Sequence, residues 1–281
     1  MKDSYFEVRI PYNKENCGEI ETMLVMYGGL SWLDEEGKFI VCLESKDEAN
    51  ELKKYIENSE ETFVKGVEVK KLVNKDWNSE WEKSIKPVEI GKKMIVYPSW
   101  LKEELGDTTG KIRIEIDPKT AFGTGHNETT QIVLELMANY LKGDEEKLLD
   151  YGCGTAILAI AGTKLGIARA VAIDNDPEAI PVAEECIKKN AESDKIELHC
   201  ANIDEIEEEE FDVICANIIS SVILENIEHI SAKAAKGAKL FISGVLMSED
   251  QDIMDHLFSY DFDIEDIMSK GEWMGIYAVR R

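Results

Sequence analysis

The stretch from Leu148 to Ala156 contains residue types that can bind a nucleoside. An apolar run ends in Asp150, Gly152 and Gly154 follow, and a helical pattern then opens; a second apolar run ends in Asp174. Glycine lets the backbone approach a ligand closely, and a carboxylate can accept both hydrogens of a ribose diol. This order of strand, turn, helix, strand and acid is typical of a nucleotide-binding βαβ unit, and a tight turn without a ligand is the alternative.

The glycine loop departs from the dinucleotide-binding pattern. The motif GxGxxG needs a third glycine at the position of Ile157. Its absence disfavours a nicotinamide oxidoreductase. The pattern D-x-G-x-G-x-A after a strand instead favours a loop for S-adenosylmethionine, which has no pyrophosphate to be cradled.

Three asparagines follow predicted strands and are expected near the same ligand. Asn175 comes directly after Asp174, Asn202 follows the third strand of the unit, and Asn217 ends the fourth. In an open parallel sheet, ligands bind beyond the carboxyl ends of the strands. Asparagine there often only makes a turn, but the position of Asn217 favours a function beside the reacting centre.

A second glycine-containing segment, residues 121–130, leads into a predicted helix. Gly123 and Gly125 flank a threonine directly after Phe122. An aromatic side chain in a flexible loop predicts a lid that covers a ligand. His126 is a candidate base, although one histidine in a turn is more often incidental.

Composition limits the class of protein. The chain has 281 residues, 44% of them hydrophobic, which suffices for one large or two smaller globular domains. No apolar run reaches the roughly 18 residues that span a bilayer, and the first residues lack a signal-peptide core. The six cysteines contain no CxxC pair, so we expect no metal site, no disulfide framework and a cytoplasmic location.

The net charge of −25, from 57 acids against 32 bases, limits the partners. Such a surface repels phosphate backbones, which disfavours contact with DNA or RNA and favours a basic protein substrate. The alternative is that the acidity serves solubility alone. We expect no membrane partner and a monomer.

Hydrophobic periodicity predicts a small N-terminal α+β domain. Residues 5–72 show the order βαββαβ, which is ferredoxin-like and favours a docking module. The expected strands are 5–10, 30–34, 39–43 and 67–72, and the expected helices are 15–27 and 47–58, the second opened by a capping box of Ser45 and Glu48. We therefore expect a docking domain over 1–72 and a connector over 73–86. Trp77 and Trp81 in the connector share a helix face, which favours interdomain packing over substrate stacking.

The remaining chain, 87–281, predicts a doubly wound α/β domain. Strands alternate with helices, which indicates a parallel sheet. The expected strands are 94–97, 111–116, 147–150, 170–174, 196–200, 211–217 and 239–244, and a helix is expected over 129–141. Two last strands, 262–270 and 273–280, are separated only by a short turn containing Gly271, so they must form an antiparallel hairpin at the sheet edge.

Several phrases together resemble one family. These are the sequence DPKTAFGTGH from Asp117 to His126, the loop DYGCG, Ala216-Asn217-Ile218, and the connector from Asp76 to Pro87. They resemble the methyltransferases of large-subunit ribosomal protein eleven, the PrmA family, over nearly the whole chain. The resemblance implies a class I, Rossmann-like methyltransferase that modifies lysine and/or N-terminal amino groups of that basic ribosomal protein, with an N-terminal domain that chooses the substrate.

The resemblance also implies site residues. Cofactor contacts are implied at Thr130, Gly152, Asp174 and Asn217, and the position of Asp150, Gly154, Asn175 and Asn202 makes these four additional candidates. The catalytic candidates are Asn217, which would orient a neutral amine through its amide oxygen, and Phe122 as the lid.

Two departures from the family pattern, and two rival functions, stay open. Thr155-Ala156 stands where family members usually carry Ser-Gly, and two alternatives stay open: the Ala156 methyl group crowds the cofactor, or alanine is tolerated at the helix start. The N-terminal domain diverges strongly, which weakens the assignment of the substrate. The rivals are a class I methyltransferase that acts on another protein or a small amine, and a non-catalytic protein that only binds the cofactor.

Overall fold

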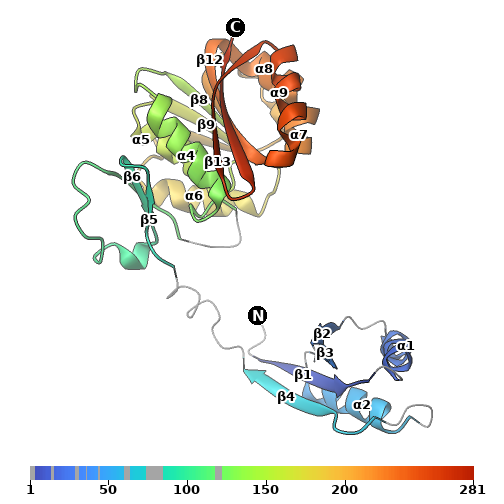
Figure 1. Cartoon of the computed structure of the whole chain (residues 1–281). Helices are drawn as coiled ribbons and strands as arrows, with labels where there is room; N and C mark the ends of the chain where they lie inside the picture. The colour runs from blue at the N-terminus through green and yellow to red at the C-terminus, as the bar shows by residue number, and fades with distance from the viewer. Residues whose placement is uncertain are drawn as a thin grey trace. The chain divides into compact units, whose positions relative to one another are not determined.

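The computed structural model describes residues 4–13, 16–28, 32–35, 37–43, 45–59, 64–73, 85–117 and 122–281. The chain divides into two compact units, Met1–Ser84 and Ile85–Arg281, and each is considered by itself (Figure 1). Domain boundaries at 72 and 87 stay a prediction. Trp77 and Trp81 lie outside the described residues.

The first unit is a four-stranded antiparallel sheet with two helices. Its strands are β1 (Ser4–Pro11), β2 (Leu33–Glu35), β3 (Lys38–Leu43) and β4 (Glu68–Val73), in the order β2-β3-β1-β4, and its helices are α1 (Cys17–Gly28) and α2 (Lys46–Glu57). Alternate strand residues point toward the helices: Val8 pairs with Val41 and Ile10 with Phe39, and all four side chains are buried. Ser45 caps α2 by accepting a hydrogen bond from the Glu48 backbone, which is half of the predicted capping box.

The second unit contains a seven-stranded sheet in the order β10-β9-β8-β11-β12-β14-β13. Its strands are β8 (Lys147–Tyr151), β9 (Arg169–Asp174), β10 (Ile196–Cys200), β11 (Phe211–Asn217), β12 (Ala234–Leu246), β13 (Phe262–Lys270) and β14 (Trp273–Arg280). The first five are parallel, and β14 runs antiparallel between β12 and β13. The predicted hairpin is therefore present, with the last strand inserted inside the sheet. Strand order reverses between β8 and β11, which opens a crevice there.

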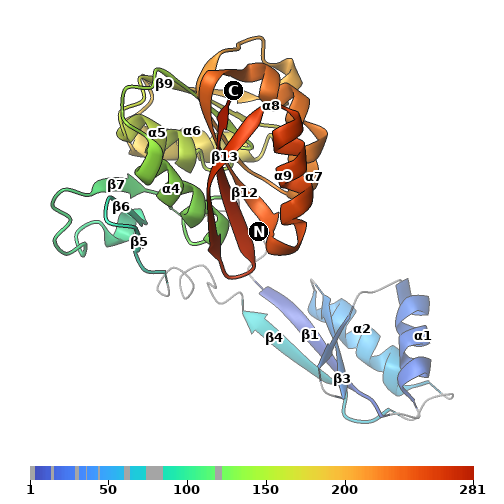
Figure 2. The ribbon, with the colours of Figure 1, turned by 45° about the horizontal axis from the view of Figure 1, so that its top comes forward.

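Helices cover both faces of this sheet (Figure 2). One side has α4 (Glu128–Tyr140), α5 (Ile157–Lys164) and α6 (Ala179–Lys189); the other has α7 (Ser220–Glu225), α8 (Ile227–Lys233) and α9 (Asp250–Ser259). Successive strand residues alternate between two apolar cores, as Leu148 packs with the first layer and Leu149 with the second. Because both faces are buried, the strands appear in the sequence as continuous apolar runs.

Residues 88–115 form a separate three-stranded sheet. The sequence predicted its second and third strands, as strands that precede the nucleotide-binding unit, and missed the first. The sheet comprises β5 (Val88–Ile90), β6 (Met94–Tyr97) and β7 (Ile112–Glu115), with the short helix η1 (Ser99–Leu101) between β6 and β7. Its apolar side packs against the α4–α5 layer. Asp117, just after β7, accepts hydrogen bonds from Ser99 and pairs with Lys189 on α6. Burial works to raise the pKa of Asp117, but these contacts outweigh it and hold the pKa below its usual value.

Two features are absent from all the residues that the structure describes. No helix there has the length and apolar character needed to cross a membrane. The same residues contain no group of three or more histidine, cysteine, aspartate or glutamate side chains arranged to hold a metal ion.

Candidate active site

A cleft of about 660 Å³ opens at the carboxyl ends of β8, β9 and β11. Six of the residues predicted for the site line it: Phe122, Gly152, Gly154, Asp174, Asn175 and Asn217. Further lining residues, among them Glu128, Thr129, Tyr151, Ile218, Ile219, Val222 and Trp273, were not singled out as ligand contacts from the sequence. Many of these residues are next to predicted site residues in the sequence, and that position is the signal by which they could have been predicted.

Both glycines of the loop after β8 adopt a backbone that only glycine takes easily. Gly152 has φ +71° and Gly154 has φ +54°. A Cβ on Gly152 would collide with the Ile218 side chain, and one on Gly154 would collide with the Phe122 carbonyl. Glycine is therefore required at both positions, because the backbone is left-handed and other loops of the protein come too close for a side chain.

Asp174 links the glycine loop to the end of β9. Its Oδ2 accepts a hydrogen bond of 2.8 Å from the Gly154 backbone, and its Oδ1 accepts one of 3.0 Å from Asp176. These two bonds fix the carboxylate at the cleft wall. A carboxylate has about four acceptor positions, so two remain for the hydrogens of a diol.

Asp150 lies behind the loop and does not line the cleft. Its Oδ2 accepts a hydrogen bond of 2.9 Å from the Ala159 backbone in the first turn of α5, and its buried Oδ1 has no partner. Complete burial raises the pKa of Asp150 to about 7. Asp150 comes before the last residue of β8 and pairs with Ala172, two residues before Asp174. Its hydrogen bond holds the first turn of α5, and its role as a cofactor contact stays a prediction.

Asn202 is also absent from the lining residues. It is exposed and caps the short helix η2 (Ile203–Glu205), and its backbone N–H donates to Glu205 Oε2 at 2.7 Å. Its role as a cofactor contact stays a prediction.

Asn217 lines the cleft and has a buried, unsatisfied oxygen. Its Nδ2 donates to Thr130 Oγ1 at 3.1 Å, whereas its Oδ1 is buried without a partner. Thr130 is fully buried on α4 and does not line the cleft, and its role as a cofactor contact stays a prediction. Leaving a buried acceptor unpaired costs about 1–3 kcal/mol, which indicates that a ligand donor completes this site.

The Phe122 segment is attached to the start of α5. The Thr155 backbone donates to the Phe122 carbonyl at 3.0 Å, and Thr155 Oγ1 donates to the Gly123 carbonyl at 2.6 Å. The Phe122 side chain itself is 53% exposed at the cleft. Gly123 and Gly125 have φ values of +97° and +81°, a conformation that favours glycine, and the role of Phe122 as a lid stays a prediction. Residues 118–121 lie outside the described residues.

Ala156 does not line the cleft, which favours the alternative that alanine is tolerated there. Its side chain is fully buried in the α4–α5 core layer and is absent from the lining residues. The backbone at Ala156 has φ +60°, a left-handed conformation that directs the methyl group inward. The consequence of alanine here is backbone strain of about 1 kcal/mol.

His126 lines the cleft but both ring nitrogens face carbonyl oxygens. Nε2 lies 2.9 Å from the Lys86 oxygen and Nδ1 lies 3.3 Å from the Thr124 oxygen. A neutral imidazole carries one N–H, so it donates to only one of these carbonyls. The shorter contact, to Lys86, fastens the loop, and the role of His126 as a base stays a prediction.

A family model described as "Ribosomal protein L11 methyltransferase (PrmA)" matches residues 5–281. The chain belongs to this family. The ribosomal protein L11 methyltransferase of Acetivibrio thermocellus is 36% identical over 201 residues, which are 72% of this chain and 63% of that protein. The one from Syntrophomonas wolfei is 34% identical over 254 residues, 88% of this chain and 81% of that protein.

A solved structure supports the same fold. The ribosomal protein L11 methylase of Lactobacillus delbrueckii subsp. bulgaricus has a TM-score of 0.64 and 26% identity, covering 70% of this chain and all of that one. The predicted fold class is confirmed: a Rossmann-like sheet of the class I methyltransferases with antiparallel C-terminal strands, plus a small N-terminal α+β sheet. The match to the Acetivibrio protein spans less than two thirds of that relative's length.

Proposed function

We propose that this protein transfers methyl groups from S-adenosylmethionine to amino nitrogens of ribosomal protein L11, at lysine side chains and/or the N-terminus. Family membership names the reaction class and the substrate of its relatives. The observation in the chain itself that carries the proposal is the buried, unpartnered Asn217 Oδ1 in a cleft bounded by the glycine loop. An N–H donor of an acceptor amine satisfies that oxygen.

The residues beside the glycine loop fit the cofactor. Asp174 has acceptor capacity left for a ribose diol, and Gly152 and Gly154 line the cleft beside it. S-adenosylmethionine supplies an electrophilic methyl group on a sulfonium. Asn175 and Tyr151 extend the same wall of the cleft.

Asn217 positions the nucleophile. Because Thr130 receives the amide hydrogen, Oδ1 is the atom that faces the acceptor nitrogen. A lysine amine, with an ordinary pKa near 10.4, must first lose a proton to solvent. The apolar side chains of Ile218, Val222 and Phe122 exclude water, which favours the neutral amine. Positioning of the lone pair in line with the methyl group then lowers the barrier.

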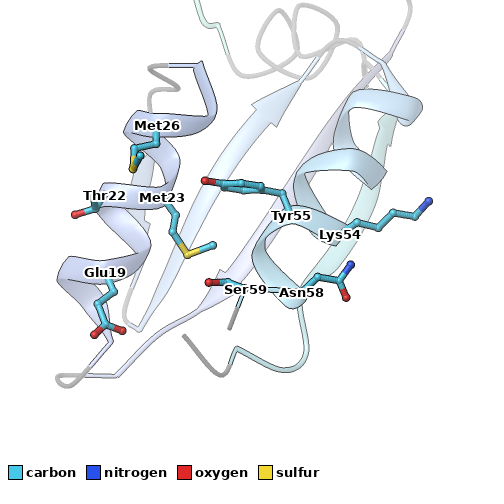
Figure 3. Close-up of a pocket in the computed structure, with 8 residues that line it drawn as sticks. All are labelled: Glu19, Thr22, Met23, Met26, Lys54, Tyr55, Asn58 and Ser59. Atoms are coloured by element: carbon cyan, nitrogen blue, oxygen red, sulfur yellow. The ribbon is translucent and has the colours of Figure 1, made fainter. Parts of the chain in front are cut away.

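We also propose that the first unit docks the substrate. Its described surface carries an apolar groove between α1 and α2, lined by Met23, Met26 and Tyr55 with Glu19 and Lys54 at its edges (Figure 3). Met26 is 75% exposed, and methionine adapts to varied apolar partners. Replacing Met26 by glutamate is expected to raise KM for the ribosomal protein, with no change in the dissociation constant of the cofactor. An unchanged KM would exclude this groove.

The proposed activity is tested by incubating the full-length protein with radiolabelled S-adenosylmethionine and ribosomal proteins from cells that lack this gene. Label on ribosomal protein L11, at lysine or the N-terminus, supports the proposal. Label on another protein or on small amines favours the first rival. Calorimetric binding of the cofactor with no labelled product favours the non-catalytic rival.

The proposed function also bears on location and on oligomeric state. A ribosomal protein substrate favours a reaction in the cytoplasm. One copy of the chain supplies all the residues that line the cleft, which favours a monomer.

A further inference from the structure

Glu128 places an unpaired carboxylate in the cleft. It is the first residue of α4 and lines the cleft, and within residues 85–117 and 122–281 no hydrogen bond or ion pair involves its carboxylate. An acid in a first helical turn is stabilised by the helix dipole, which is the ordinary reason for its presence. The carboxylate, however, lies over the tip of the β13–β14 hairpin: a Cβ on Gly271 would come within 2.5 Å of Glu128 Oε2.

Two residues that line the cleft have buried oxygens without a partner. Thr129 Oγ1 and Asn217 Oδ1 have no hydrogen-bond partner, and the two residues are only 5% and 8% exposed. No lysine or arginine is among the residues that line the cleft. Lys270, on β13, donates to Gln131 and not to Glu128. Two oxygen acceptors and one carboxylate without a cationic partner suit a ligand group that is both a hydrogen-bond donor and a cation.

Sheet order separates this group from the ribose-binding position. Asp174 ends β9, Asn217 ends β11, and Trp273, which lines the cleft near Gly271, begins β14. Along the order β9-β8-β11-β12-β14, Asn217 stands two strands from each of the other two. Neighbouring strands are about 4.8 Å apart, so Asp174 and Trp273 stand on opposite sides of Asn217, each about 10 Å away. Glu128 thus belongs to the acceptor side of the reacting centre.

We propose that Glu128 is a specificity-determining residue that receives the acceptor amine in its ammonium form, with the Trp273 ring at the same corner of the cleft. This inference rests on the proposed amine methylation. A carboxylate close to an ammonium attracts it and favours its charged form. Glu128 therefore strengthens capture of the acceptor while opposing its deprotonation. Glu128 therefore lowers KM for the acceptor and does not accelerate the methyl-transfer step.

The test compares Glu128→Gln with Glu135→Gln in the full-length protein. Glu135 lies on the same helix but does not line the cleft. Glu135→Gln therefore removes the same charge from α4 without changing the cleft. Ribosomal protein L11 is the acceptor. Glu128→Gln is expected to raise KM about tenfold, an effect of about 1.4 kcal/mol. It leaves kcat at neutral pH unchanged or higher, moves the acid limb of the kcat profile to lower pH, and leaves the cofactor dissociation constant unchanged.

The other outcomes are distinct. Glu135→Gln should change none of these quantities, and Glu128→Asp should recover part of the lost KM. A weaker cofactor dissociation constant in Glu128→Gln, with KM for the acceptor unchanged, would assign the carboxylate to the cofactor and overturn the inference. An unchanged KM and pH profile would leave only the helix-dipole role and overturn it as well. A wild-type protein that labels no acceptor would instead contradict the proposed function.

Discussion

At the scale of single residues, the cleft depends on one amide with only one of its two ends hydrogen-bonded. Asn217 Nδ2 donates to Thr130, and its Oδ1 is buried without a partner. The bond to Thr130 restrains this side chain before a substrate arrives, which reduces the entropy lost on positioning the amine.

Replacing Asn217 by alanine is expected to lower kcat about 100-fold or more while changing the cofactor dissociation constant by less than about threefold. The reason is that Oδ1 acts on the acceptor nitrogen and not on the ribose. Steady-state kinetics with ribosomal protein L11 and calorimetry with the cofactor give the two numbers. As a matched pair, Thr130→Val should lose part of kcat and Thr130→Ser should retain it. Equal losses in kcat and affinity would contradict the orienting role.

Ala156→Gly is expected to leave cofactor affinity unchanged, because the Ala156 methyl group lies in the core. The effect on stability is small, because relief of about 1 kcal/mol of left-handed strain is offset by a lost buried methyl of about 0.8 kcal/mol and by added unfolded-state entropy. Calorimetry and urea unfolding measure both quantities. A tenfold gain in cofactor affinity would restore the crowding hypothesis.

At the scale of elements, Glu145 links the loop after α4 to strand β12. It accepts hydrogen bonds from the backbones of Lys142 and Gly143 and pairs with Lys239, and it is nearly buried. Burial alone would raise the pKa of Glu145, but the Lys239 contact and the backbone donors lower it to about 2. A folded pKa below the ordinary 4.5 means that the ionised carboxylate stabilises the fold.

Glu145→Gln is accordingly expected to destabilise the protein by about 2 kcal/mol at neutral pH, because Lys239 loses its buried partner. The stabilisation by Glu145 is complete above its unfolded pKa of 4.5 and is lost as pH falls toward about 2. Urea unfolding of both proteins across this range measures the difference. The two free energies should converge in acid, and a difference independent of pH would show that only packing was lost.

Strand ends explain where sequence reasoning succeeded and where it failed. The predicted strands 211–217, 262–270 and 273–280 have the observed bounds, because clear turn residues such as Gly271 separate apolar runs. Asp150 and Asp174 gave the same signal, an acid at the end of an apolar run. Only Asp174 is the last residue of its strand, and β8 extends one residue past Asp150. Asp150 pairs with Ala172, two residues before Asp174, so its side chain lies deeper on the same face of the sheet, beneath the first turn of α5. A single sequence does not define this pairing.

The separate sheet of β5, β6 and β7 shows a second limit of prediction from the sequence. Its strand patterns were readable from residue 94 onward, but local periodicity carries no information about which sheet a strand joins. That choice depends on long-range contacts such as Asp117 with Lys189 and the Glu115 backbone with Asn190. The same holds for Thr130, whose role through Asn217 appears only once α4 and β11 are adjacent.

At the scale of the whole molecule, the net charge of −25 produces a long-range field that attracts a basic protein. The field acts on the encounter, so it contributes to kcat/KM rather than to kcat. Salt screens it, because the Debye length falls from about 10 Å at 0.1 M to about 3 Å at 1 M. The cofactor, by contrast, meets only the charges of the cleft.

We therefore expect kcat/KM for ribosomal protein L11 to fall about tenfold between low and high salt, while kcat and the cofactor dissociation constant change little. Initial rates at several salt concentrations, with calorimetry at the same concentrations, test this. A short peptide that carries one acceptor amine and few other charges is the control, and its kcat/KM should depend weakly on salt. If the protein and the peptide show the same dependence, the field of the whole surface plays no part in capture, and the acidity serves solubility alone.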